Sequence, residues 1–109
     1  FEAMRGDFFN RTYVGPLLAN PMDHAKRLTM SMAYIEAGQF PEALTHLPLV
    51  TGPWRELATY LIGYSYAGLG DFERAAQYVE EALSINPGHI GYMTSLCWIY
   101  SEQIARLTR

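Results

Sequence analysis

Two stretches of this chain, 32 positions apart, share four residues at identical positions. The recurring pairs are Tyr34 and Tyr66, Gly38 and Gly70, Phe40 and Phe72, and Ala43 and Ala75. A period of about 20 to 50 residues indicates units that cannot bury their apolar face alone and therefore stack on their neighbours. With 109 residues, the chain has room for a few such units but not for two full domains.

Apolar residues recur every three or four positions from residue 22 onward, which predicts helices and no strand. Asp23 and Asp71 are placed to cap helix N-termini, and Gly38 and Gly70 to follow helix C-termini in the left-handed conformation. The predicted helices run from Asp23 to Ala37, Pro41 to Leu49, Pro53 to Gly68, Phe72 to Ile85 and His89 to Leu107. We therefore expect about 60% helix or more, against about a third in a typical globular protein.

Small residues are expected where the helices cross. Gly63 and Ala75 should face each other within one unit, because neither side chain keeps the two backbones apart. Ala82 should meet the helix that follows. Tyr66 and Phe72 would fill the space around the turn at Gly70.

Residues 59–87 carry a set of residues at fixed spacings over two successive predicted helices. Its positions are Thr59, Ile62, Gly63 and Tyr66 on the first helix, Ala75 and Val79 on the second, and then Pro87. Apart from Thr59 in place of a tryptophan, this pattern resembles the signature of the tetratricopeptide repeat family. The resemblance implies an all-α superhelix of antiparallel helix pairs over residues 23–109, with about two repeats and a C-terminal capping helix.

Residues 1–22 are harder to place. Gly6 and Phe8 lie 32 positions before Gly38 and Phe40, but Arg11 stands where an alanine is expected. We interpret this segment as a degenerate repeat remnant or as an N-terminal covering segment. Since the chain opens on Phe1 rather than on methionine, we expect it to have been trimmed from something longer.

Composition excludes several classes of function. The net charge of −3 gives no basic footprint for nucleic acid. A single cysteine, Cys97, excludes a disulfide-stapled scaffold. No apolar run approaches the roughly 20 residues of a membrane span, and no signal peptide is recognisable.

Residues for catalysis or metal binding are sparse. His24, His46 and His89 lie on different helices or helix boundaries, so they do not form a metal-ligand set. Cys97 takes the position that Gly63 has in the preceding first helix, which predicts a buried small side chain. We therefore predict no enzyme, no metal and no cofactor.

The resemblance implies that first helices line a concave face on which a ligand binds. By register, the groove residues are Leu28, Met32, Tyr60, Leu61, Tyr64 and Trp98. The same register places Ile35, Leu57, Thr94 and Ser101 beside them. These positions carry none of the lysines and asparagines with which some family members clamp a terminal carboxylate. The sequence therefore favours a protein–protein interaction module that binds an apolar or amphipathic segment, as a chaperone or assembly factor would.

Two alternatives stay open. The N-terminal segment could itself cover the groove, since it carries Phe8, Phe9, Tyr13, Val14, Leu17 and Leu18. The chain could also be a structural module that stacks end to end or forms a homo-oligomer. Concentration-dependent mass in solution would favour that second alternative.

Overall fold

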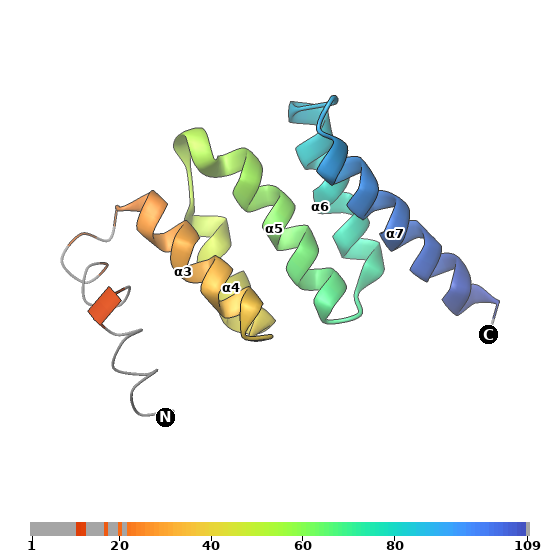
Figure 1. Cartoon of the computed structure of the whole chain (residues 1–109), viewed down its shortest axis with the longest axis horizontal. Helices are drawn as coiled ribbons and strands as arrows, with labels where there is room; N and C mark the ends of the chain where they lie inside the picture. The colour runs from red at the N-terminus through yellow and green to blue at the C-terminus, as the bar shows by residue number, and fades with distance from the viewer. Residues whose placement is uncertain (1–10, 13–16, 18–19, 21, 109) are drawn as a thin grey trace.

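The computed structural model describes residues 11–12, 17, 20 and 22–108, and from residue 22 onward the chain is almost entirely helical (Figure 1). The α-helices are α3 (His24–Glu36), α4 (Phe40–His46), α5 (Arg55–Gly68), α6 (Phe72–Ile85) and α7 (Ile90–Leu107). Two short 3₁₀ helices, η2 (Leu47–Leu49) and η3 (Gly52–Trp54), join α4 to α5. No strand occurs among the described residues, so the predicted all-α fold is confirmed.

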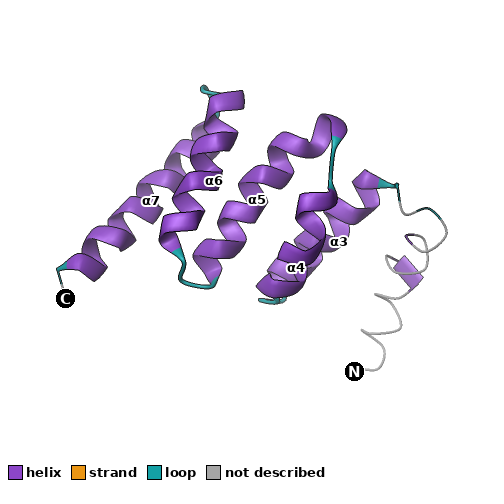
Figure 2. Ribbon diagram, turned by 180° about the vertical axis from the view of Figure 1, so that it is seen from behind, coloured by secondary structure: helices purple, strands orange, loops and turns teal. Residues whose placement is uncertain are grey.

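The helices form two antiparallel pairs and a closing helix. α3 packs against α4, α5 against α6, and α7 against α6. The pairs lie side by side in chain order, as the front and back views show (Figures 1 and 2). This is the stacked arrangement that the internal repeat predicts.

Aspartates and glycines define the helix ends as predicted. Asp23 accepts a hydrogen bond from the Lys26 backbone N–H at 2.9 Å, and Asp71 accepts one from that of Arg74 at 3.2 Å. Gly38 and Gly70, with φ of 75° and 84°, make the turns that follow α3 and α5. A side chain with a Cβ atom would be strained in this left-handed conformation.

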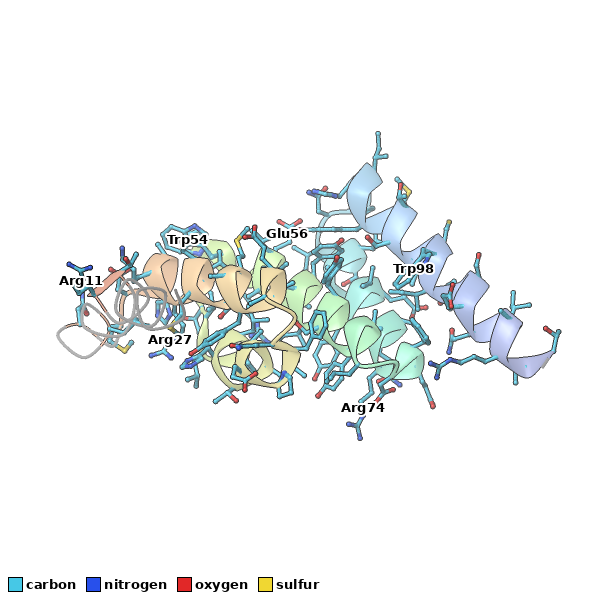
Figure 3. All side chains as sticks on the ribbon, turned by 60° about the horizontal axis from the view of Figure 1, so that its bottom comes forward. Arg11, Arg27, Trp54, Glu56, Arg74 and Trp98 are labelled. Carbon is cyan, nitrogen blue, oxygen red and sulfur yellow. The ribbon has the colours of Figure 1, made fainter. Side chains whose placement is uncertain are left out.

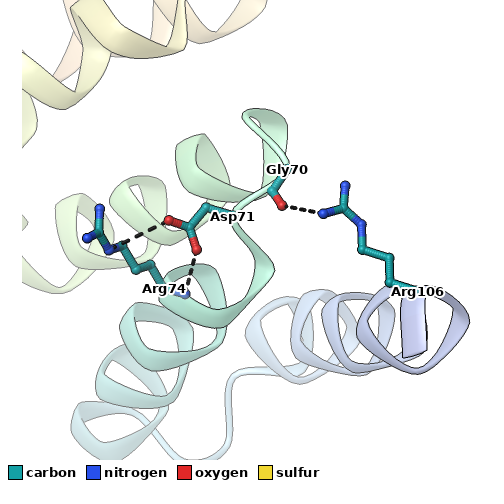
Figure 4. A network of polar contacts seen from close by, with 4 residues as sticks. All are labelled: Gly70, Asp71, Arg74 and Arg106. Carbon is teal, nitrogen blue, oxygen red and sulfur yellow. Dashed lines mark hydrogen bonds and ion pairs between the residues drawn. The ribbon is translucent and has the colours of Figure 1, made fainter.

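The end of α7 is tied to the turn at Gly70. Arg106 donates a hydrogen bond from Nη1 to the Gly70 carbonyl oxygen at 2.9 Å, on the far side of the turn from the Asp71–Arg74 contacts (Figure 4). The Arg106 guanidinium also lies 4.7 Å from the centre of the Phe72 ring. These two contacts fix the C-terminal half of α7 against the start of α6.

Helix α4 is shorter than predicted. It ends at His46, and the expected continuation to Leu49 is the 3₁₀ helix η2. Pro48 accounts for the difference, since it has no N–H to donate within an α-helix. The next helix likewise begins with a 3₁₀ turn at Gly52–Trp54 and becomes α-helical only at Arg55.

The crossing of α5 and α6 is as close as predicted. A Cβ atom on Gly63 would lie 2.9 Å from the Ala75 carbonyl oxygen and 2.8 Å from Cγ2 of Val79. Ala82 is fully buried in the cluster that also holds Tyr92 and Ile99 of α7. The repeat register is therefore correct at this crossing.

The predicted burial of Cys97 is wrong. This residue is exposed, although its repeat equivalent Gly63 is buried. Gly63 is buried because α6 crosses it, whereas α7 packs only against α5 and α6 among the described elements. The face of α7 that carries Cys97 therefore has no neighbour in this part of the chain.

Most of the N-terminal segment lies outside the described residues. Of the six apolar residues that could cover the groove, Phe8, Phe9, Tyr13, Val14 and Leu18 are outside them, and Leu17 is buried. None of the described helices is both long and apolar enough to cross a membrane.

Candidate functional site

A cavity of about 320 Å³ opens between α5 and α7. Its lining comes from three helices: Phe40 of α4, then Tyr64, Ala67 and Gly68 of α5, then Thr94, Ser95 and Trp98 of α7. Aromatic and small residues dominate this lining, and it contains no charged side chain. An apolar concavity with a few hydroxyl groups is typical of a site for an apolar ligand group.

Two aromatic rings on successive first helices face this cavity. Tyr64 and Trp98 are 34 positions apart in the sequence, and the fold brings both into one lining. Their exposed fractions are 45% and 49%. Trp98 is supported by Phe72, whose ring meets it edge-on with the centroids 5.6 Å apart. Two of the positions that the register assigned to one groove therefore lie close together in the structure.

Tyr60 joins α5 to α7 rather than lining the cavity. Its hydroxyl lies 2.6 Å from Oγ of Ser95, and its ring stacks on Tyr92 with the centroids 4.6 Å apart. Burial raises the pKa of Tyr92, and the nearby Glu56 carboxylate and Tyr60 raise it further. Because it pairs with Ser95, the hydroxyl of Tyr60 is already hydrogen-bonded within the fold.

The other predicted groove residues do not converge on the cavity. Leu28 and Leu61 are buried in the core between the two helix pairs, which corrects their assignment to an exposed groove. Met32 is 41% exposed on α3 but is absent from the cavity lining. A helix with two apolar faces gives no sign of which one packs inward, and this explains the error.

Phe40 is a lining residue that the groove prediction missed. Its ring occupies the space that a Cβ atom on Gly68 would need, so the glycine lets the ring lie against α5. The signal was present in the repeat: Phe40 is the equivalent of Phe72, which contacts Trp98 in the next unit. Each of these phenylalanines thus supports the first helix that follows it.

The hydroxyl groups at the cavity are mostly engaged. Thr94 donates from Oγ1 to the Ile90 carbonyl oxygen at 2.9 Å, and Ser95 pairs with Tyr60. The Trp98 indole N–H and the Tyr64 hydroxyl are the remaining polar groups of the aromatic pair. We therefore expect recognition to depend on apolar contact, with few directed hydrogen bonds.

The histidines serve local structure. Nδ1 of His46 lies 2.8 Å from Nη1 of Arg27, and its ring stacks on Tyr34. Burial lowers the pKa of His46, and the positive charge of Arg27 lowers it further, so both favour the neutral ring. His24 pairs with Thr51, and His89 accepts from the Tyr92 backbone N–H. Within the described part of the chain, no three His, Cys, Asp or Glu side chains are grouped to hold a metal ion.

The family comparison matches the two helices at the centre of the molecule. Residues 57–89 match the family model described as "Tetratricopeptide repeat". These residues are a tetratricopeptide repeat. They comprise most of α5, all of α6 and the turn before α7, so the cavity lies between the first helix of this repeat and the helix that follows it. Tetratricopeptide repeats are in general protein–protein interaction modules. No curated protein matches the chain.

Proposed function

We propose that this protein is a non-enzymatic interaction module that binds an apolar segment of a partner protein in the cavity between α5 and α7. The observation that carries the proposal is the pair Tyr64 and Trp98, two half-exposed aromatic rings that line one uncharged cavity. Aromatic anchors of this kind commonly supply most of the energy of a protein interface.

The size of the cavity limits what can enter it. At about 320 Å³ it is at the lower end of the range for ligand pockets. It therefore fits one large apolar side chain, with neighbouring residues of the partner lying across the surrounding surface of α5 and α7. The partner would present an aromatic or long aliphatic residue, either from an extended peptide or from one face of a helix.

A peptide-display selection on the purified chain tests this proposal. The selected peptides should share one large apolar residue, and replacing that residue by aspartate should abolish binding. Tyr64→Ala should weaken binding of the same peptides about tenfold or more, because it removes one wall of the cavity.

Tyr100 provides a matched control for this experiment. It is a tyrosine with 41% exposure, close to the 45% of Tyr64, but it lies outside the cavity lining. Tyr100→Ala should leave the peptide affinity unchanged. Peptides that lack an apolar anchor, or that lose as much affinity with Tyr100→Ala as with Tyr64→Ala, would contradict the proposal.

A further inference from the structure

The outer face of α7 is an uninterrupted apolar stripe. Along α7, exposed apolar residues recur at spacings of three and four positions: Ile90, Met93, Cys97, Tyr100, Ile104 and Leu107. The most exposed of them are Leu107 at 86% and Ile90 at 75%. This spacing is the heptad pattern with which one helix packs against another.

In α5, the first helix of the preceding repeat, the equivalent face packs against another helix. The residues of α5 that lie 34 positions before Met93, Cys97 and Tyr100 are Thr59, Gly63 and Tyr66. Gly63 meets the backbone of α6, and Tyr66 stacks on Tyr78 of α6 with the ring centroids 5.6 Å apart. The face that α5 covers with a helix is therefore the face that α7 leaves exposed in the described part of the chain.

We propose that this stripe, defined by the six residues from Ile90 to Leu107, pairs antiparallel with the same stripe of a second copy of the chain. The positions are symmetric about a point midway between Trp98 and Ile99. A two-fold axis at that point brings every stripe residue opposite another one. The apposed pairs are Ile90 with Leu107, Met93 with Ile104, and Cys97 with Tyr100.

The flanks of the stripe favour self-pairing. In an antiparallel pair of helices, equivalent flanking positions meet each other, so charged flanks would repel their own copies. The flanking residues Thr94, Ser101 and Thr108 on one side and Leu96 and Gln103 on the other carry no charge. His89, the N-cap of α7, is a titratable residue in the row of Leu96 and Gln103. The small Cys97 also leaves room for the Tyr100 ring that would face it.

The stripe is presented on a fixed helix. Arg106 holds the end of α7 against Gly70 and Phe72, and Tyr92 and Ile99 are buried against α6. Trp98 points to the other side of α7, since one residue along a helix is a rotation of about 100°. The cavity and the stripe therefore lie on different sides of α7 and adjoin at Thr94, which lines the cavity and flanks the stripe.

The area available predicts weak association. Six such side chains bury on the order of 100 Å² each, or about 1,200 Å² over two copies. This is the lower limit for a specific protein interface. We expect an equilibrium between monomer and dimer that shifts with concentration in the micromolar range.

Sedimentation over a concentration series tests the pairing. The wild-type chain should pass from monomer to dimer, and Ile104→Glu should raise the dissociation constant at least tenfold, because each copy would bury a charge against Met93. Leu49→Glu is the control: Leu49 is an exposed aliphatic residue (54%, against 61% for Ile104) on η2, away from α7. A chain that stays monomeric at every concentration, or a dimer unaffected by Ile104→Glu, overturns the proposal.

Cys97 allows the direction of the pair to be tested. In the antiparallel register the two copies of Cys97 are about 4.5 Å apart along the helix axis, so a short bismaleimide should link them. Moving the single thiol to the helix end, with Cys97→Ser and Leu107→Cys, separates the two copies by about 25 Å and should abolish the link. Equal cross-linking of both variants would indicate parallel or unspecific contact and would overturn the register.

Discussion

Gly63→Leu should destabilise the fold by about 3 kcal/mol, the upper part of the usual range for overpacking a core. The reason is the contact at the α5–α6 crossing, where even a Cβ atom would be 2.9 Å from the Ala75 carbonyl oxygen. A flexible side chain could turn aside, but the backbone of α6 cannot do so without opening the repeat. The melting temperature should fall by roughly 12 to 24 °C, measured by circular dichroism of the helical signal.

Gly88→Leu is the matched control for this prediction. Gly88 lies in the turn between α6 and α7, and a Cβ atom there would meet nothing within 4 Å. The same substitution should therefore change the melting temperature by only a few degrees. If Gly63→Leu had the same melting temperature as Gly88→Leu and the wild type, the close crossing of α5 and α6 at Gly63 would be contradicted.

Trp98→Ala should weaken peptide binding by about 2 kcal/mol or more, which is about a thirtyfold rise in the dissociation constant. Trp98 forms one wall of the cavity, and half of its surface is available to a ligand. The variant should stay folded but lose about 2 kcal/mol of stability, because about half of the indole ring is buried, partly edge-on against Phe72. Titration with a selected peptide and a thermal melt of the same variant measure the two effects.

Trp54→Ala is the matched control for Trp98→Ala. Trp54 is the second tryptophan of the chain, it is 41% exposed, and it lies in η3 against α3, away from α7 (Figure 3). Trp54→Ala should keep the peptide affinity of the wild type. A Trp98→Ala chain that is unfolded would show that Trp98 is a core residue, and one that binds normally would show that the ligand site is elsewhere.

Much of the fold could be predicted because its signals are local. Asp23 and Asp71 at the helix starts, and Gly38 and Gly70 at the turns, act within a few residues of their own position. The internal repeat added one long-range contact, between Gly63 and Ala75, because the same helix pair had to close in each unit.

The candidate site was only partly predictable, since burial depends on neighbours. The repeat register placed Tyr64 and Trp98 together, but it could not show that Leu28 and Leu61 pack into the core. Cys97 was assigned to the interior by analogy with Gly63, although the helix that would bury it is absent from the described chain. Local pattern gives the register of a helix, whereas the next element decides which face is covered.

The indole N–H signals of the two tryptophans offer the most direct test of the proposed binding site. Trp54 and Trp98 are the only tryptophans in the sequence, so a nitrogen–proton correlation spectrum should show two such signals, assigned with Trp54→Phe. On titration with a selected apolar peptide, the Trp98 signal should move in proportion to the bound fraction while the Trp54 signal stays in place. Binding that leaves the Trp98 signal unmoved, or that moves only the Trp54 signal, would contradict a site between α5 and α7.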